Sequence, residues 1–181
     1  MVPYYTILAI LPVCSATAAC LGPEVNQPAL NLVQQFEDFR ATIYKDPAGH
    51  PAVGYGHLCS DSACSDVPYT IPLSYTDAER LLRDDLADCI TNDTGNNVVL
   101  NANQYGALVS WAFNVGCENS GFSALIERLN MGEDPTSVAT DELPRWNMIG
   151  DEVVPAFERR RAAEVDLFLA PSGEDALPAL C

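Results

Sequence analysis

The stretch that decides the fold is Phe36–His57, FEDFRATIYKDPAGHPAVGYGH, which places two carboxylates in two different local structures. Glu37 stands near the end of a segment with the apolar spacing of a helix. Asp46 opens the tetrapeptide DPAG, whose Asp, Pro and Gly predict a type I β-turn. Carboxyl groups in different surroundings can differ in acidity, and cleavage of a glycosidic bond uses such a pair. A purely structural role for Asp46, bonding the backbone of its own turn, is the alternative interpretation.

Apolar periodicity predicts that the chain outside this stretch is mostly helical. Thr76 and Glu79 have the spacing of a capping box, which would open a helix. The segment at Asn103–Phe113 is apolar on almost every side, which predicts a central buried helix that ends at Gly116. The expected elements are a helix from Pro28 through Arg40, hairpin strands at Ala41–Tyr44 and Ala52–Tyr55, and helices at about 77–91, Asn103–Phe113, Phe122–Asn130, Pro135–Leu143 and Ala156–Leu169.

Two C-terminal features have a plain structural interpretation. The Arg159–Arg161 run lies beside Glu158 and Glu164, and we expect it to form a solvated helix face that pairs with acidic neighbours. The tail from Pro171 is expected to be disordered until Cys181 anchors it.

Composition limits the class of protein. The 181 residues are 48% hydrophobic and 19% charged, which is the balance of one globular domain. The formal net charge is −16 and Lys45 is the single lysine, so nucleic-acid binding is disfavoured, because phosphate binding needs clustered Lys and Arg. No apolar run of membrane-spanning length follows the N-terminal segment. We therefore expect one domain, a monomer, with no nucleic-acid partner and no membrane span.

The N-terminal segment, residues 1–19, has the pattern of a secretory signal peptide. Tyr4–Val13 is an apolar core, and the small residues of Ala16–Ala18 resemble a cleavage site. This predicts a secreted, extracellular protein whose single domain spans residues 20–181. A buried N-terminal element and a lipoprotein site at Cys20 are the competing interpretations.

The cysteine count agrees with an oxidising compartment. Seven Cys are present, and removal of Cys14 with the signal leaves an even number, which predicts three disulfides. Their spacings do not match a zinc site, so no metal is expected. Fifteen connectivities are open for six Cys. The pairs we expect are Cys59–Cys64, Cys89–Cys117 and Cys20–Cys181.

The chain resembles the phage-type lysozymes, glycoside hydrolase family 24, in several ordered blocks. Glu37 precedes Asp46 by nine positions, and Gly54–His57 (GYGH) follows. The resemblance covers about residues 28–169, and the secretory signal and added Cys residues make the chain similar to a secreted, fungal branch of that family. The further blocks that carry it are Asn101–Gly116, Arg128–Glu133, Arg145–Asn147, Val154–Pro155 and Arg159–Glu164.

The resemblance implies an α+β, lysozyme-like fold, mostly helical, with a small β-hairpin lobe and a substrate cleft between lobes. It implies hydrolysis, with inversion, of the β-1,4 bond between N-acetylmuramic acid and N-acetylglucosamine in bacterial peptidoglycan. Glu37 would protonate the leaving oxygen, and Asp46 would position or activate the water. The partners implied are peptidoglycan glycan strands, and no cofactor is implied.

Four residues are expected to line the cleft, because sugar faces stack on apolar surface while amides bond acetamido groups. They are Tyr55, Leu58, Phe113 and Asn114. His57 is expected to pair with a carboxylate of the helix at about 77–91, and to be structural.

One position departs from the pattern of the family. Ala52 stands where the family usually carries a Thr that helps hold the water. This motivates a second hypothesis, a catalytically impaired cell-wall binding protein on the same fold. The sequence also leaves open a chitinase and an acidic, disulfide-stabilised effector of a protein partner. The strong negative charge leads us to expect an acidic pH optimum.

Overall fold

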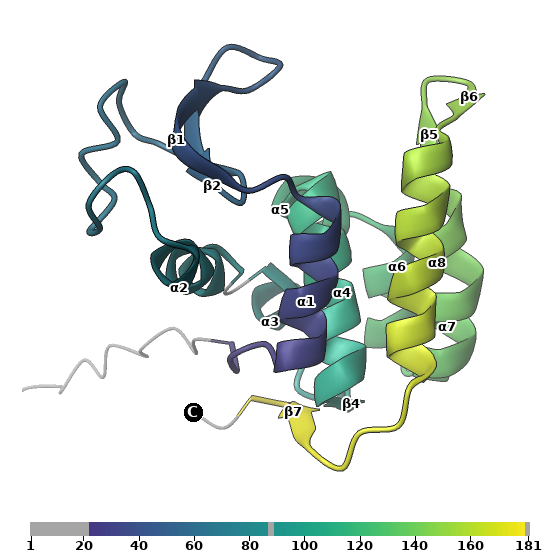
Figure 1. Ribbon diagram of the computed structural model, residues 1–181. Coiled ribbons are helices and arrows are strands. Elements are labelled where there is room, and N and C mark those ends of the chain that lie inside the picture. The colour runs from purple at the N-terminus through teal and green to yellow at the C-terminus, as the bar shows by residue number, and fades with distance from the viewer. Residues whose placement is uncertain (1–21, 87–88, 180–181) are drawn as a thin grey trace, which may run out of the picture.

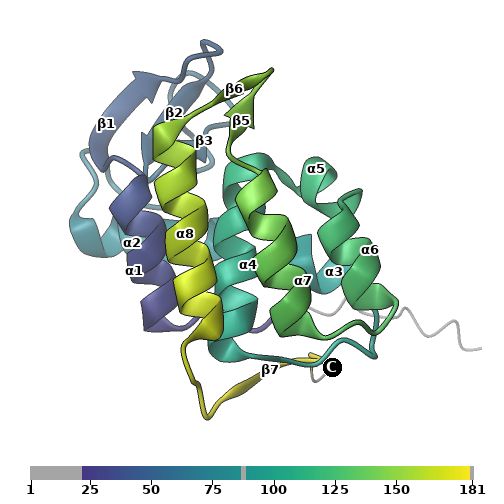
Figure 2. The same ribbon diagram turned by 90° about the vertical axis from the view of Figure 1, so that its right-hand side faces the viewer.

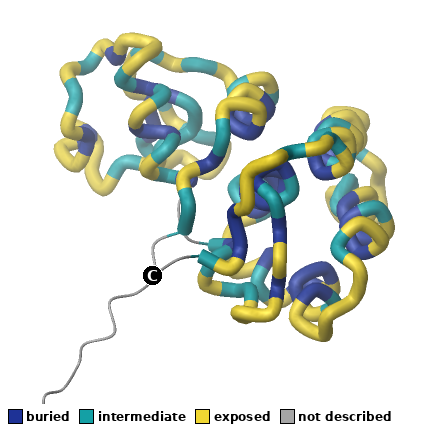
Figure 3. The backbone as a smooth tube through the Cα atoms, turned by 90° about the horizontal axis from the view of Figure 1, so that it is seen from below, coloured by how far each residue is buried: buried dark blue, intermediate teal, exposed yellow. Residues whose placement is uncertain are grey.

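The computed structural model describes residues 22–86 and 89–179, which form a small sheet lobe beside a larger helical lobe (Figure 1). The expected signal peptide at 1–19 and the expected Cys20–Cys181 disulfide lie outside the described residues. Buried residues gather into two clusters, a large one among the helices and a small one under the sheet (Figure 3). The predicted α+β, lysozyme-like architecture is confirmed.

Helix α1 (Gln27–Phe36) leads directly to the first carboxylate. Asn26 caps it by accepting a bond from the Ala29 N–H at 3.1 Å, and Pro28 lies in its first turn. The helix ends at Phe36, earlier than expected, because Glu37 takes an extended backbone. The expectation of a helix through Arg40 is therefore wrong, and that residue instead begins the sheet.

The sheet has three antiparallel strands in the order β1 (Arg40–Lys45), β2 (Pro51–Gly54) and β3 (His57–Leu58). The predicted hairpin is confirmed, and β3 is an addition that the sequence pattern did not show. The DPAG turn joins β1 to β2, with the Gly49 N–H bonded to the Asp46 carbonyl at 2.9 Å. The reversal into β3 needs left-handed backbone at Gly54 and Gly56, with φ of +72° and +95°.

Two short helices follow the Cys-rich loop. Helix α2 (Tyr75–Asp85) is capped by Ser74, whose hydroxyl accepts from the Asp77 N–H at 3.1 Å, so the expected capping box at Thr76 is displaced by two residues. Its apolar face covers the sheet, and α3 (Cys89–Asp93) comes next. The single helix expected over 77–91 is thus wrong.

Helix α4 (Ala102–Val115) is the centre of the helical lobe, as predicted, and the other helices surround it (Figure 2). Asn101 and Gln104 form its capping box, and the helix ends at Gly116, whose φ is +88°. Trp111 is fully buried and meets the Trp146 ring at 5.4 Å. The lobe is completed by α1 and by α5 (Cys117–Gly121), α6 (Ala124–Asn130), α7 (Pro135–Glu142), η1 (Leu143–Arg145) and α8 (Pro155–Leu169).

Two small pairings depart from the sequence expectations. Strands β5 (Met148–Ile149) and β6 (Glu152–Val153) form a hairpin between the segments expected as helices at Pro135–Leu143 and Ala156–Leu169, where no element was expected. Strand β7 (Asp175–Leu177) pairs with β4 (Leu100–Asn101), so the expectation of a disordered tail is wrong for this segment. The β4–β7 pairing joins segments far apart in the chain and leaves no local signature.

Two of the three expected disulfides lie within the described residues, and both are formed. Cys59–Cys64 closes a small loop in the sheet lobe. Cys89–Cys117 ties α3 to α5 in the helical lobe. Within the described residues, each lobe therefore has one covalent crosslink.

Candidate active site

A hollow of about 680 Å³ lies where the sheet, the end of α1 and the C-terminal half of α4 meet. It brings together five of the six residues expected to act on or bind a substrate, including both carboxylates. The residues that line it are Glu37, Tyr44, Asp46, Pro47, Gly56, His57, Leu58, Asp85, Phe113 and Asn114.

Glu37 reaches this hollow because α1 ends one residue before it. Its side chain is 25% exposed, and Oε1 accepts a bond from Nη1 of Arg160 at 2.6 Å. The guanidinium itself is buried, and it lies over the Phe36 ring at 5.6 Å. A short charge-assisted bond of this kind fixes the orientation of the carboxyl group.

Behind Arg160 lies a buried cluster of charges. Arg160 Nε and Arg161 Nε lie 3.2 Å and 2.7 Å from the two oxygens of Glu164, which is fully buried. The Ser110 hydroxyl donates to Glu164 at 2.9 Å, and Arg160 Nη2 donates to the Ser110 carbonyl at 3.2 Å. Burial raises the pKa of Glu164, which its two Arg neighbours oppose, and burial lowers the pKa of Arg161. The expectation of a solvated Arg face is wrong for these two Arg, and only Arg159 is exposed.

The same cluster orients Asn114. Arg161 Nη2 donates to its side-chain oxygen at 2.9 Å. With the oxygen occupied in this way, the amide –NH₂ is the group of Asn114 that remains to donate to a ligand. Acetamido groups of amino sugars offer a carbonyl acceptor for such a donor.

Asp46 is held by its own turn. Oδ1 accepts from the His50 backbone N–H at 2.7 Å, and the His50 ring Nδ1 lies 3.4 Å from Oδ2. The backbone bond from His50 is the largest cause that lowers the pKa of Asp46, and burial opposes it. Asp46 thus bonds the backbone of its own turn, as the sequence suggested, and the same carboxylate also lines the hollow.

His57 pairs with a carboxylate of α2, as predicted. Its Nδ1 lies 2.8 Å from Asp85, and its Nε2 lies 3.3 Å from Asp66. Burial raises the pKa of Asp85, which the bond from His57 opposes. The pair ties β3 to α2 at the floor of the hollow.

Tyr55 does not line the hollow. It is half-buried, and its ring packs against Phe39 at 5.4 Å. Tyr55 lies in the turn between β2 and β3, whose left-handed glycines Gly54 and Gly56 flank it, and its ring packs under the sheet with Phe39 instead of facing the hollow. Ala52 is fully buried and is paired across the sheet with Tyr44 and Leu58, both of which line the hollow.

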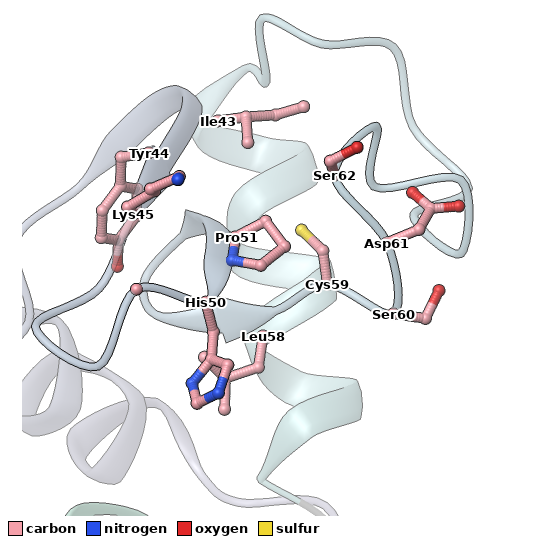
Figure 4. A pocket seen from close by; sticks show the side chains of 11 residues that line it. Ile43, Tyr44, Lys45, His50, Pro51, Leu58, Cys59, Ser60, Asp61 and Ser62 are labelled. Atoms are coloured by element: carbon pink, nitrogen blue, oxygen red, sulfur yellow. The ribbon is translucent and has the colours of Figure 1, made fainter.

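A second hollow, of about 910 Å³, lies in the sheet lobe (Figure 4). The two share Tyr44 and Leu58 as walls. Its other lining residues are Ile43, Lys45, Gly49, His50, Pro51, Cys59, Ser60, Asp61 and Ser62.

Sequence reasoning missed Arg160, Arg161 and Glu164 as parts of the site. A signal was present, because Glu164 follows the two Arg at the helical spacings of three and four residues that bring side chains together. That spacing does not distinguish an exposed ladder from a buried cluster. Within residues 22–86 and 89–179, no group of three or more His, Cys, Asp or Glu is arranged to hold a metal ion, and no helix is long and apolar enough to cross a membrane.

A helical lobe, a small sheet lobe and a carboxylate-lined hollow between them define a lysozyme-like protein. Solved structures share this fold. The muramidase domain of SpmX from Asticaccaulis excentricus superimposes with a TM-score of 0.65 at 31% identity, covering 82% of this chain and 99% of that domain. A mutant P22 lysozyme gives a TM-score of 0.67 at 27% identity, with the same coverage.

Sequence comparison identifies the family. The family model described as phage lysozyme matches residues 34–164, and the chain belongs to this family. An endolysin of Bacillus phage PZA is 36% identical over 148 residues, which is 80% of this chain and 55% of that protein. An endolysin of Salmonella phage P22 is 29% identical and is covered over 96% of its length. The chain spans about half the length of the two Bacillus phage endolysins that it matches, at 55% and 54%.

Proposed function

We propose that the protein is a lysozyme, an N-acetylmuramidase that hydrolyses the β-1,4 bond between N-acetylmuramic acid and N-acetylglucosamine in bacterial peptidoglycan. The observation that carries the proposal is that Glu37 and Asp46 line one hollow from different elements, in a chain of the phage lysozyme family. The names of the relatives, endolysins and a muramidase domain, agree with it. No cofactor is part of the proposal.

In the proposed reaction Glu37 is the general acid. It gives its proton to the oxygen of the leaving sugar, while Arg160 keeps the carboxyl group aimed at that oxygen. Asp46 is the general base, which removes a proton from the water that attacks the anomeric carbon on the opposite face. The product would then have the inverted, α configuration.

Three residues of the hollow are proposed to bind the glycan. Leu58 and Phe113 offer apolar surface from the sheet lobe and the central helix, and Asn114 offers its amide. Tyr55 supports the sheet through its contact with Phe39 and is not proposed as a binding residue.

The test is release of reducing ends from purified peptidoglycan between about pH 4 and about pH 7. Glu37→Gln is expected to lose at least about 10²-fold in rate, because a general acid contributes that much or more. Asp38→Asn is the matched control, since its side chain is 91% exposed and its ion-pair partner among the described residues is Arg40 at 3.6 Å. Equal rates for the wild type and Glu37→Gln would contradict the proposal.

Two competing functions receive no support from the comparisons, whose relatives are endolysins and lysozymes. A catalytically impaired wall-binding protein would bind peptidoglycan without releasing reducing ends. Activity that is restored by Ala52→Thr would then identify the missing hydroxyl as the cause. A chitinase would release ends from chitin in preference to peptidoglycan.

We also propose that the protein is secreted after removal of residues 1–19, that residues 20–181 form a single domain, and that it is a monomer of a fungal branch. The supporting observations are the apolar N-terminal sequence and the disulfide in each lobe. Cys20–Cys181 is proposed as the third disulfide. N-terminal sequencing of the mature protein, with a non-reducing peptide map, tests the cleavage site and this pairing together.

A further inference from the structure

His50 is the basic side chain in direct contact with Asp46. The backbone N–H of His50 donates to Oδ1 at 2.7 Å, and its ring Nδ1 lies 3.4 Å from Oδ2. The Asp46 N–H donates in return to the His50 carbonyl at 2.9 Å. Among the residues that the structure describes, no other charged side chain forms an ion pair with Asp46.

The His50 ring acts on Asp46 from outside the catalytic hollow. His50 does not line that hollow, and its side chain is 67% exposed. It lines the adjoining hollow together with Leu58 (Figure 4). Because it touches a catalytic carboxylate without lining the hollow, its role can only be to position Asp46 or to set its charge.

The other charged groups near this pair do not replace His50. The catalytic hollow also contains the titratable side chains of Glu37, Tyr44, His57 and Asp85, and His57 is already paired with Asp85 and Asp66. The adjoining hollow contains Lys45 and Asp61, and the latter is held by Ser65 in its own loop. Burial opposes ionisation of Asp46, and the contacts with His50 act against that effect.

We propose that His50 is a positioning residue whose protonated imidazole keeps the Asp46 carboxylate ionised, and therefore active as a base, at acidic pH. This rests on the proposed function, in which Asp46 activates the water. The protonated ring is a cation whose Nδ1 lies 3.4 Å from the Asp46 carboxylate, so the two groups form an ion pair in that state. The ring bond and the ring charge both lower the pKa of Asp46, after the larger effect of the His50 backbone bond. The base then remains ionised further into acid than an unpaired Asp would.

Two substitutions separate the ring charge from the ring hydrogen bond. His50→Gln keeps a side-chain donor and the backbone N–H but has no charge, whereas His50→Lys is a permanent cation. The first readout is the dependence of kcat/KM on pH with peptidoglycan as substrate. The second is the titration of the Asp46 carboxyl carbon followed by ¹³C NMR, which needs no activity.

The expected result is that His50→Gln loses about two- to fivefold in kcat/KM near pH 4, the range of an exposed ion pair, and is unchanged near pH 7. His50→Lys should keep the wild-type rate in acid. Salt at about 1 M should reduce the difference in kcat/KM between the wild type and His50→Gln near pH 4, because it screens exposed charges. In the NMR titration, Asp46 should ionise at higher pH in His50→Gln.

The inference is overturned if the Asp46 titration is the same in the wild type and His50→Gln, or if His50→Lys loses as much activity in acid as His50→Gln. A shifted titration in a protein that cleaves no peptidoglycan would sustain the coupling between His50 and Asp46 while contradicting the proposed function. The two readouts therefore distinguish failure of the inference from failure of the function.

Discussion

The helical lobe and the β1–β2 turn each hold one carboxylate of the hollow, but the kind of contact differs. The helical lobe holds Glu37 through a residue far away in the chain, whereas the turn holds Asp46 through a residue close to it in the chain. Glu37 is bonded to Arg160, a residue 123 positions away, which is anchored in turn on the fully buried Glu164. Asp46 is bonded to His50, four positions away at the surface. The proposed acid thus depends on the packing of α8 against α4, whereas the proposed base depends on a turn of a few residues.

The largest expected effect comes from breaking the buried cluster. Glu164→Gln leaves the buried Arg161 without its counter-charge and leaves Arg160 paired with Glu37, which should cost about 3–5 kcal/mol of unfolding free energy. Urea denaturation at neutral pH measures it. Glu158→Gln is the matched control, as an exposed glutamate on the same helix, and it should be nearly neutral. A cost below about 1 kcal/mol for Glu164→Gln would contradict the stabilising role given to the buried cluster of Arg160, Arg161 and Glu164.

The disulfides allow a comparison of the two lobes by loop length. Cys89–Cys117 closes a separation of 28 residues and Cys59–Cys64 a separation of 5. If chain entropy dominates, replacing both cysteines of the longer loop by Ser should cost about 3–4 kcal/mol, against about 2 kcal/mol for the shorter loop. The denaturant midpoints of the two double variants show which of the two disulfides contributes more to stability. The reverse order would show that strain or residual structure outweighs loop entropy.

The smallest expected effect on stability is that of Asp46→Asn, because the turn is local and exposed. The pKa of Asp46 is lowered in the folded protein by the His50 backbone bond, so its stabilising contribution is complete above the ordinary Asp value of about 3.9. That contribution is lost as the pH falls through the lower folded value. The gap in melting temperature between wild type and Asp46→Asn should therefore be present at pH values above about 3.9 and close in strong acid. A gap that stays open in strong acid would contradict this assignment.

Much of the site could be predicted from the sequence, because its strongest signals are local. The DPAG turn, the Gly residues of the β2–β3 reversal and the all-round apolar α4 each indicate their structure within a few residues. These elements bring Asp46, Leu58 and Phe113 to one hollow. Family resemblance then supplied the chemical roles that spacing alone leaves open.

The features that were missed are the ones that depend on distant partners. The exposed-face interpretation of Arg160 and Arg161 failed because helical charge spacing looks the same on a buried and an exposed face. The pairing of β7 with β4 joins segments about 75 residues apart, and no local pattern marks it. Tyr55 was expected in the cleft because sugar faces stack on apolar surface, but in the β2–β3 turn its ring packs against Phe39.

The central claim is that two carboxylates in unlike structures act as acid and base on one glycosidic bond. The most direct test is the anomeric configuration of the first product, followed by ¹H NMR during cleavage of a peptidoglycan oligosaccharide. We predict that the α-anomer appears first and then mutarotates, because Asp46 activates a water on the face opposite the leaving group. Initial formation of the β-anomer would contradict the role assigned to Asp46.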